Sequence, residues 1–359
     1  MGVGAFSPAS VAARATEQTV VRPFESRDAT GWETFVRRCP HATFFHRIGW
    51  RDVIESVFRH RPHYLVAERG IEVVGILPLI EVRSWLFGNA LISSPFCVYG
   101  GPAADDVETE RALIDAAEEL ARSLGVDHLE LRNRAAKCPG WPHQDLYVTF
   151  RHELAPEVEA NLRAIPRKQR AMVRKGIKHG LKSEIDQTVD RFFELYADNV
   201  HRHGTPALPK SYFARLRAVF GDCCEVLTVT DQGGRPVSGV LSFYFRDEVL
   251  PYYAGDTLAA RDLAGNDFKY WELMRRACER GIRVFDFGRS KRDTGSFAFK
   301  KNWGFEPSAL CYEFRLLRRK SVPENNPLNP KYRAFIGLWR HLPLGVANAL
   351  GPHIVRSLG

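Results

Sequence analysis

The chain has 359 residues, of which 45% are hydrophobic and 26% charged, the balance of a soluble globular protein with room for two ordinary domains. No stretch reaches the roughly 18 apolar residues of a membrane-spanning helix, and the first residues lack the basic and apolar regions of an export signal. The net charge of +9 favours polyanionic partners such as nucleic acid, nucleotide phosphates or an anionic membrane surface.

The seven cysteines are irregularly spaced and form no C-x-x-C pair, so we expect reduced thiols and a cytoplasmic protein. Residues 1–19 are expected to form a flexible tail. Residues 63–82 then contain two β-rich runs broken at Arg69-Gly70, which predicts a hairpin. Residues 108–125 have the apolar spacing of a helix that ends at a glycine and leads into a strand.

The second half repeats this order of signals. Residues 225–256 predict a hairpin about Gly233-Gly234 with a third strand beyond it, and a helix from about 266 to 280 leads into a strand that carries Asp286. Gly75 and Gly239 occupy matching places in the two halves. The repeat predicts an α/β (α+β) protein of two tandem domains, each a mixed twisted sheet flanked by helices. We place the domains at residues 20–180 and 181–318.

The junction between the halves predicts a basic helix over residues 166–182, with Val173, Ile177 and Leu181 as its apolar stripe. Residues 163–182 contain eight basic side chains and no acidic one. This density predicts a face that binds phosphates, although a charged helix is more often simply solvated. The residues expected to bind the phosphates of a donor are Arg167, Arg170, Arg174 and Lys178.

The segment 285–307 combines aromatic and cationic residues after a predicted buried strand, where loops gather reactive groups. In acyl transfer to an amine the carbonyl oxygen gains negative charge, and a preorganised Lys300 or Lys301 could stabilise it. The alternative is that the aromatic residues are core and the lysines reach solvent along its edge. The sequence has no G-x-S-x-G, Walker, H-E-x-x-H or G-x-G-x-x-G motif, and its His pairs lack acidic or thiol companions, so no metal site is predicted.

Several segments together resemble the FemAB (FemABX) transferases of the GNAT superfamily. They are IPRKQRAMVRKGIKHG, RHGTPALPKSYFARL, YYAGD and VFDFGRSKRDTGSFAFKKNWGF, and the similarity runs from about residue 20 to 317. It looks closest to the FemAB-like branch associated with exosortase and PEP-CTERM export, which carries a BioF2-like acetyltransferase domain.

This resemblance implies two GNAT-like domains whose substrates meet between them, and the transfer of an aminoacyl group from charged tRNA to an amine of a peptidoglycan precursor. The family's catalytic lysine falls on Lys300, and its DFG strand end falls on Asp286 to Gly288. The residues expected to bind substrate are Phe299, Lys301, Asp286, Arg289, Ser290 and Tyr253.

Two features depart from the family or its superfamily. The second half shows no long paired-helix insertion, and the turn that holds the pyrophosphate of acetyl-CoA in ordinary GNAT enzymes is missing. We therefore expect a FemAB-type N-acyltransferase without a resident cofactor, whose co-substrate is aminoacyl-tRNA or acyl-CoA and whose acceptor is a peptidoglycan or exopolysaccharide precursor. The alternatives are an acyl-thioester-dependent enzyme acting on a sugar amine, and a non-catalytic RNA-binding or scaffold protein.

Residues 319–359 predict a Pro- and Asn-rich linker followed by an amphipathic tail. The tail combines large apolar residues with Arg340, His341 and Arg356, as interfacial helices do. We expect it either to touch the inner face of the membrane or to pack on the protein's own surface.

Overall fold

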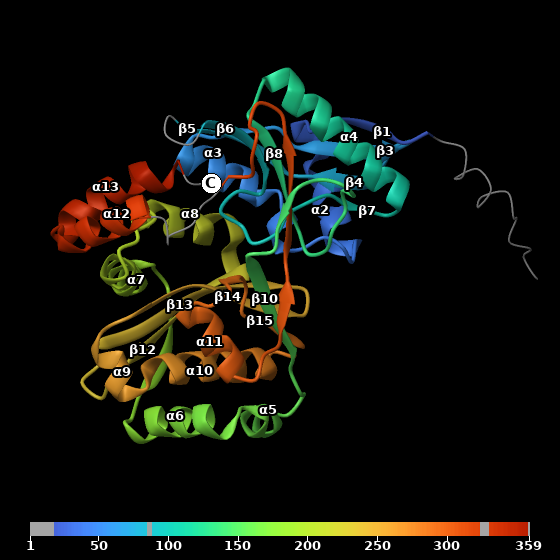
Figure 1. Cartoon of the computed structure of the whole chain (residues 1–359). Helices are drawn as coiled ribbons and strands as arrows, with labels where there is room; N and C mark the ends of the chain where they lie inside the picture. Colours follow the sequence, from blue (N-terminus) through green and yellow to red (C-terminus); the bar gives the residue numbers. More distant parts are fainter. Residues whose placement is uncertain (1–17, 85–87, 324–329, 358–359) are drawn as a thin grey trace, which may run out of the picture.

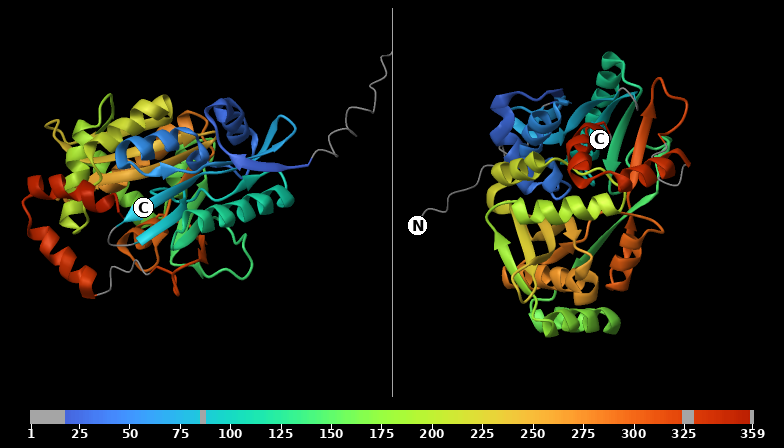
Figure 2. Two further views of the ribbon diagram at one scale, coloured as in Figure 1. Left: turned by 90° about the horizontal axis from the view of Figure 1, so that it is seen from above. Right: turned by 90° about the vertical axis from the view of Figure 1, so that its left-hand side faces the viewer.

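The structure, a computed structural model, describes residues 18–84, 88–323 and 330–357. Two mixed α/β units are joined by strands that run between them, and two C-terminal helices project from one side (Figures 1 and 2). The predicted fold class, two tandem domains of sheets flanked by helices, is confirmed. The expected flexible tail at residues 1–19 lies almost wholly outside the described residues.

The first unit contains two sheets, whose strands β4 and β5 follow one another across Pro78. The first sheet has the order β1 (Val20–Pro23), β3 (Leu65–Arg69), β4 (Glu72–Leu77) and β7 (Ala103–Ala104). The second has the order β2 (Arg61–Pro62), β5 (Leu79–Ser84), β6 (Gly88–Ser93), β8 (His128–Asn133), β18 (Cys311–Leu316) and β9 (His143–Gln144). Its helices are α2 (Ala29–Arg38), α3 (Gly49–Phe58) and α4 (Val107–Leu124), with short 3-10 turns at Ser26–Asp28 and Phe44–His46.

Local signals explain the elements that the sequence predicted in this unit. Gly70 has a φ of 62° at the β3–β4 turn, a conformation that glycine adopts without steric cost. Helix α4 begins where the Asp106 side chain accepts a hydrogen bond from the Thr109 amide, and it ends at Gly125 in the left-handed conformation. Strand β8 follows it and pairs in parallel with β6.

The second unit is a single twisted sheet covered on both faces. Its order is β11 (Lys182–Asp186), β12 (Cys224–Thr230), β13 (Pro236–Phe245), β14 (Glu248–Asp256), β15 (Val284–Asp286), β10 (Tyr147–Glu153) and β16 (Ser290–Lys291), with β17 (Pro307–Ala309) also paired to β10. Helices α7 (Asp190–Arg202) and α8 (Lys210–Phe220) cover one face. On the other lies α10 (Gly265–Glu279), preceded by α9 (Ala259–Leu263) and covered in turn by α5 (Val158–Ala164) and α6 (Arg167–Lys178).

The two units exchange strands. Strand β10 precedes the predicted boundary at residue 180 but pairs with β15, β16 and β17 of the second unit. Strand β18 comes from the end of the second half but pairs with β8 and β9 of the first unit. The sheets therefore do not divide at residue 180. Strand pairing is non-local, so the order of elements along the sequence did not reveal the exchange.

One hydrophobic core runs through both units. It joins Phe44 and Trp50 of the first unit to Phe220 and Phe243 of the second. The rings of Phe44 and Phe243 stack with centroids 4.4 Å apart, and Arg246 donates to the carbonyl oxygen of Cys39 at 2.6 Å. Because aromatic side chains bury large apolar areas, this shared core holds the units in one fixed arrangement.

Gly255 in β14 lies against the backbone of α7. A Cβ atom at Gly255 would clash with the Tyr196 nitrogen and lie 2.5 Å from the Leu195 oxygen. At Gly239 on β13 the tightest contact of a Cβ atom would be with the flexible Leu195 side chain at 3.1 Å, and its other neighbours lie at ordinary contact distances. We expect Gly255→Ala to lower the free energy of unfolding by roughly 3 kcal/mol, and the control Gly239→Ala by no more than about 1 kcal/mol. Denaturant titration of both variants checks this, and equal losses would contradict it.

Candidate active site at the junction of the two units

Asp286 lies at the end of β15, where β15 and β14 part. The two strands pair in parallel only at Glu248–Val284 and Val249–Phe285, and β14 continues alone on this side to Asp256. The buried Asp286 carboxylate accepts hydrogen bonds from four donors. They are Thr149 Oγ1 at 3.0 Å, Arg151 Nη1 at 2.7 Å, the Gly288 amide at 2.8 Å and the hydroxyl of Tyr99.

These contacts make Asp286 a point of contact between the two units, because Tyr99 belongs to the first unit, and Thr149 and Arg151 belong to the exchanged strand β10. Arg151 also pairs with Glu248, and these carboxylates hold the pKa of its guanidinium above the usual value although burial opposes this. With four donors bound, Asp286 orients the loop that follows it. The sequence predicted that it contacts substrate, and that role stays a prediction.

Lys300 lies on α11 (Gly295–Asn302) and points back to the same loop. Its buried ammonium donates to the carbonyl oxygens of Phe287 at 2.7 Å, Gly288 at 2.9 Å and Arg289 at 3.1 Å. All three protons of the ammonium are thus directed at the backbone. Burial lowers the pKa of Lys300 to about 7, and the nearby Asp286 carboxylate opposes that fall. The structure therefore places Lys300 as the residue that fixes the loop 287–289.

Arg289 projects from this fixed loop. Its guanidinium carbon lies 4.6 Å from the ring centroid of Tyr147 and 5.9 Å from that of Tyr312, and Nη1 donates to the Tyr312 hydroxyl at 3.2 Å. The residue remains exposed, and within the described ranges no carboxylate forms an ion pair with it. A guanidinium held over aromatic faces without an acidic partner is suited to bind a carboxylate or phosphate.

Tyr252 and Tyr253 of β14 lie close enough to Arg289 to interact electrostatically with its guanidinium. The Tyr252 hydroxyl donates to the Phe96 carbonyl oxygen at 2.9 Å, and the hydroxyls of Tyr253 and Tyr212 lie 3.0 Å apart. Burial raises the pKa of Tyr252 and Tyr253 well above the usual value, so both remain protonated at neutral pH. Both side chains keep some exposed area.

The other predicted substrate-binding residues differ in their surroundings. Ser290 Oγ is buried and finds no hydrogen-bond partner in the described part of the chain. Phe299 packs in the core against Tyr270 of α10 and against Trp303. Lys301 is exposed. The structure thus brings Asp286, Arg289, Ser290, Lys300 and Tyr253 to one region, whereas Phe299 is a packing residue behind Phe287 of the loop and Lys301 faces solvent.

Sequence reasoning missed the residues that the first unit and the exchanged strands contribute to this site. They are Phe96, Tyr99, Tyr147, Thr149, Arg151 and Tyr312. The one available signal was the alternation of β10, which places Thr149 and Arg151 on the same face of a partly buried strand. Nothing local connected that strand with Asp286.

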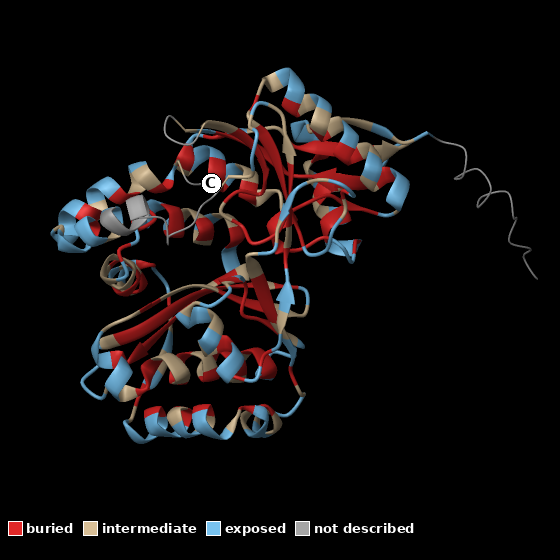
Figure 3. Cartoon of the chain, in the orientation of Figure 1, coloured by how far each residue is buried: buried red, intermediate tan, exposed pale blue. Residues whose placement is uncertain are grey.

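The predicted phosphate-binding residues lie elsewhere. Helix α6 packs on α10 through Val173 and through Gly176, where a Cβ would lie 2.8 Å from that of Phe268. Ile177, which the sequence assigned to the apolar stripe, is 50% exposed, because Gly176 makes the close contact. Helix α6 lies on the far side of α10 from the first unit (Figures 1 and 3). On it Arg167, Arg174 and Lys178 are exposed and Arg170 is half-buried. Over the described residues none of the four pairs with a carboxylate, and they are not part of the junction site.

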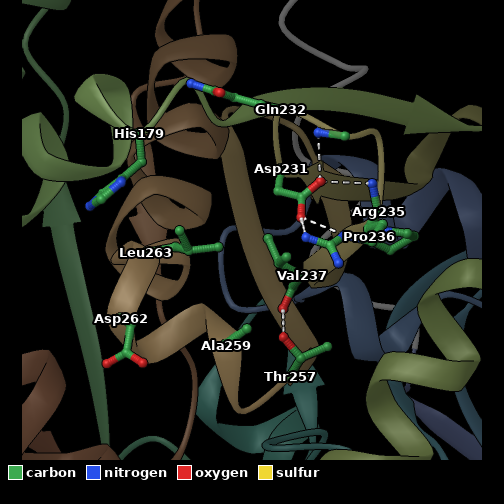
Figure 4. A pocket seen from close by; sticks show the side chains of 11 residues that line it. His179, Asp231, Gln232, Arg235, Pro236, Val237, Thr257, Ala259, Asp262 and Leu263 are labelled. Atoms are coloured by element: carbon green, nitrogen blue, oxygen red, sulfur yellow. Dashed lines mark hydrogen bonds and ion pairs between the residues drawn. The ribbon is translucent and has the colours of Figure 1, made fainter.

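A pocket of about 600 Å³ lies at the tip of the β12–β13 hairpin, beside the end of α6 and the α9 turn (Figure 4). Its lining includes His179, Asp231, Arg235, Thr257 and Asp262. The Asp231 carboxylate is occupied by Arg235 Nε at 2.9 Å and by two backbone amides. None of the predicted site residues lines this pocket, so we do not assign the reaction to it.

Comparisons with known proteins agree with the fold. Residues 163–301 match the family described as Acetyltransferase (GNAT) domain. FemX superposes with a TM-score of 0.66 at 16% identity, covering 83% of this chain and 98% of FemX. The C-terminal domain of a putative lysylphosphatidylglycerol synthetase from Agrobacterium fabrum gives a TM-score of 0.57 at 15% identity, covering 80% and 92% of the two chains.

A tandem GNAT protein from the clavulanic acid biosynthesis pathway gives a TM-score of 0.51 at 14% identity, covering 85% of this chain and all of that one. No curated protein matches the sequence. The match places a GNAT-type acetyltransferase domain within residues 163–301, and the predicted enzyme class, an acyltransferase, is confirmed. The two tandem units of this chain have the same fold as FemX. Among the described helices, none combines the length and apolar character needed to cross a bilayer.

Proposed function

We propose that this acyltransferase moves an aminoacyl or acyl group to an amine of a cell-envelope precursor, of peptidoglycan or exopolysaccharide type. The observation that carries the proposal is the loop 287–289, held by Lys300 on one side and Asp286 on the other, with Arg289 free of acidic partners among the residues that the structure describes. Such a rigid cationic loop suits a reaction in which negative charge develops on a carbonyl oxygen.

The proposed chemistry needs no resident cofactor. The acceptor amine attacks the acyl carbonyl carbon, a C–N bond forms, and the bond to the donor's ribose oxygen or thioester sulfur breaks. The amine loses a proton and the leaving oxygen or sulfur gains one. We propose that Lys300 exchanges one of its three carbonyl acceptors for the acyl oxygen when the donor binds, while Arg289 holds an anionic group of a substrate.

Each alternative has one observation in its favour. Strand β14 continues from Leu250 to Asp256 without a strand partner on the β15 side, and this edge could hold an extended acyl thioester for transfer to a sugar amine. The unpaired basic face of α6 favours a polyanion such as charged RNA, as donor or as partner of a non-catalytic protein. The resemblance to the exosortase-associated branch adds an exopolysaccharide precursor as a candidate acceptor, and we propose that the reaction takes place in the cytoplasm at the inner face of the membrane.

A transfer assay read by mass spectrometry tests the proposal. Purified protein is incubated with envelope precursors and with either a pool of charged tRNA or a pool of acyl-CoA. We expect product from one pool and a loss of about 100-fold or more in Arg289→Gln. The matched control is Arg283→Gln, at the opposite end of β15, where Arg283 forms an exposed pair with Asp247.

RNase-sensitive product identifies aminoacyl-tRNA as the donor, and product from the acyl-CoA pool replaces it with a thioester. If neither pool yields product while the protein still binds RNA through α6, the transferase proposal fails and the non-catalytic alternative takes its place.

A further inference from the structure

The C-terminal hairpin, formed by α12 (Pro330–His341) and α13 (Leu344–Val355), is docked on both units. The inner side of α13 buries Ala347, Gly351 and Val355 at a spacing of four residues. A Cβ at Gly351 would lie 2.9 Å from the Ala207 carbonyl oxygen, so the helix backbone touches the second unit. His60 Nε2 of the first unit lies 2.8 Å from the Arg356 carbonyl oxygen and fixes the end of the hairpin.

Large apolar side chains are exposed on the part of the hairpin that we call its outer face. Of the ten large hydrophobic residues exposed in the described part of the chain, five lie between residues 335 and 350, and the others are scattered. They are Phe335 at 36% exposure, Leu338 at 68%, Leu344 at 37%, Val346 at 44% and Leu350 at 47%. Single exposed apolar residues are ordinary, but such a concentration in one hairpin indicates an interaction surface.

The positive charge of the hairpin indicates which kind of partner its outer face binds. Residues 325–359 contain four Lys or Arg residues and no Asp or Glu, and Arg340, His341, His353 and Arg356 are exposed. A second copy of this chain would bring like charges together, which disfavours self-association through this face. A bilayer with anionic headgroups offers both an apolar interior and the opposite charge.

We propose that the outer face of the C-terminal hairpin docks on an anionic lipid surface. The apolar side chains enter the boundary between headgroups and acyl chains, and the arginines contact lipid phosphates. Because the inner face is fixed on both units, docking would hold the whole molecule in one orientation on the membrane. The inference does not depend on the transfer reaction, since binding can be measured without any substrate.

Sedimentation of the full chain with lipid vesicles tests the proposal. We expect binding to vesicles that contain phosphatidylglycerol, weaker binding to pure phosphatidylcholine, and a decrease with added salt. The double variant Leu338→Ser with Leu350→Ser should bind at least roughly tenfold more weakly. The matched control is Ile71→Ser with Leu258→Ser, which removes two apolar side chains that are more exposed than Leu338 and Leu350 but lie elsewhere.

Three outcomes overturn the proposal: no binding to anionic vesicles, equal losses in the two double variants, or a concentration-dependent dimer that the Leu338/Leu350 variant abolishes. Arg340→Gln supplies a second measurement. It should reduce binding to phosphatidylglycerol vesicles and leave binding to neutral vesicles unchanged, and an equal effect on both would contradict the charge argument.

Discussion

Replacing Lys300 with methionine should reduce acyl transfer about 100-fold or more while the chain still folds. Methionine keeps the apolar length of the side chain but offers no proton to the carbonyl oxygens of Phe287, Gly288 and Arg289. The loop would then lose the contacts that hold Arg289 in place, so kcat should fall together with the affinity for the anionic substrate. The control is Lys301→Met, the exposed neighbour on the same helix, which should keep full activity.

The pH dependence of stability gives a readout independent of activity. Burial lowers the pKa of Lys300 to about 7 in the folded state, whereas the unfolded chain keeps the ordinary value near 10.5. Between these values the unfolded state binds more protons, so the free energy of unfolding should rise with pH. Relative to Lys300→Met, the wild type should gain at most on the order of 4 kcal/mol from pH 7 to pH 10.

Denaturant titrations at several pH values measure this difference. A difference that does not change over the window would mean that the three carbonyl oxygens keep the folded ammonium charged. In that case the ammonium remains a full donor to the loop and burial does not set its protonation.

Replacing Asp286 with alanine should give the second large effect, a loss of roughly 3 kcal/mol or more in the free energy of unfolding. The substitution leaves the donors of Tyr99, Thr149 and Arg151 without their buried acceptor, and unsatisfied buried donors are costly. Transfer should also be lost, because the Gly288 amide no longer anchors the loop.

Tyr99→Phe is the matched control for this prediction. It removes only the contact from the first unit and should cost about 1 kcal/mol. Denaturant midpoints of both variants, measured together with their transfer activity, test this prediction. If Tyr99→Phe were as destabilising as Asp286→Ala, the contact between the units would carry the effect and the loop anchor would not.

Much of the fold could be predicted because its signals are local. Turn glycines, the cap of α4 and the apolar spacing of α4 and α10 lie within a few residues of the elements they define, and their repeated order indicated two related units. The exchange of β10 and β18 had no such signal. Pairing between Phe314 and Glu130, for example, joins residues of opposite halves, and a short apolar strand fits the edge of many sheets equally well.

The candidate site likewise contains some residues that could be predicted from the sequence and others that could not. Asp286, Arg289, Ser290 and Lys300 lie within one short segment, and both its composition and its resemblance to the FemAB transferases pointed to them. Tyr99 and Arg151 reach that segment only through the packing of the units. The basic face of α6 was recognised from its charge, but charge does not tell which side of α10 a helix covers, and the structure separates it from the junction.

The exchanged strands also affect how the chain folds during its synthesis. Strand β18 lies between β8 and β9, so the first unit cannot complete its sheet until residue 316 has left the ribosome. Folding of that unit must therefore wait for nearly the whole second unit, which makes the contacts of the first unit long-range and its folding slow. A nascent chain that stops short of β18 would expose the edge of β8, and holdase chaperones would meet it there.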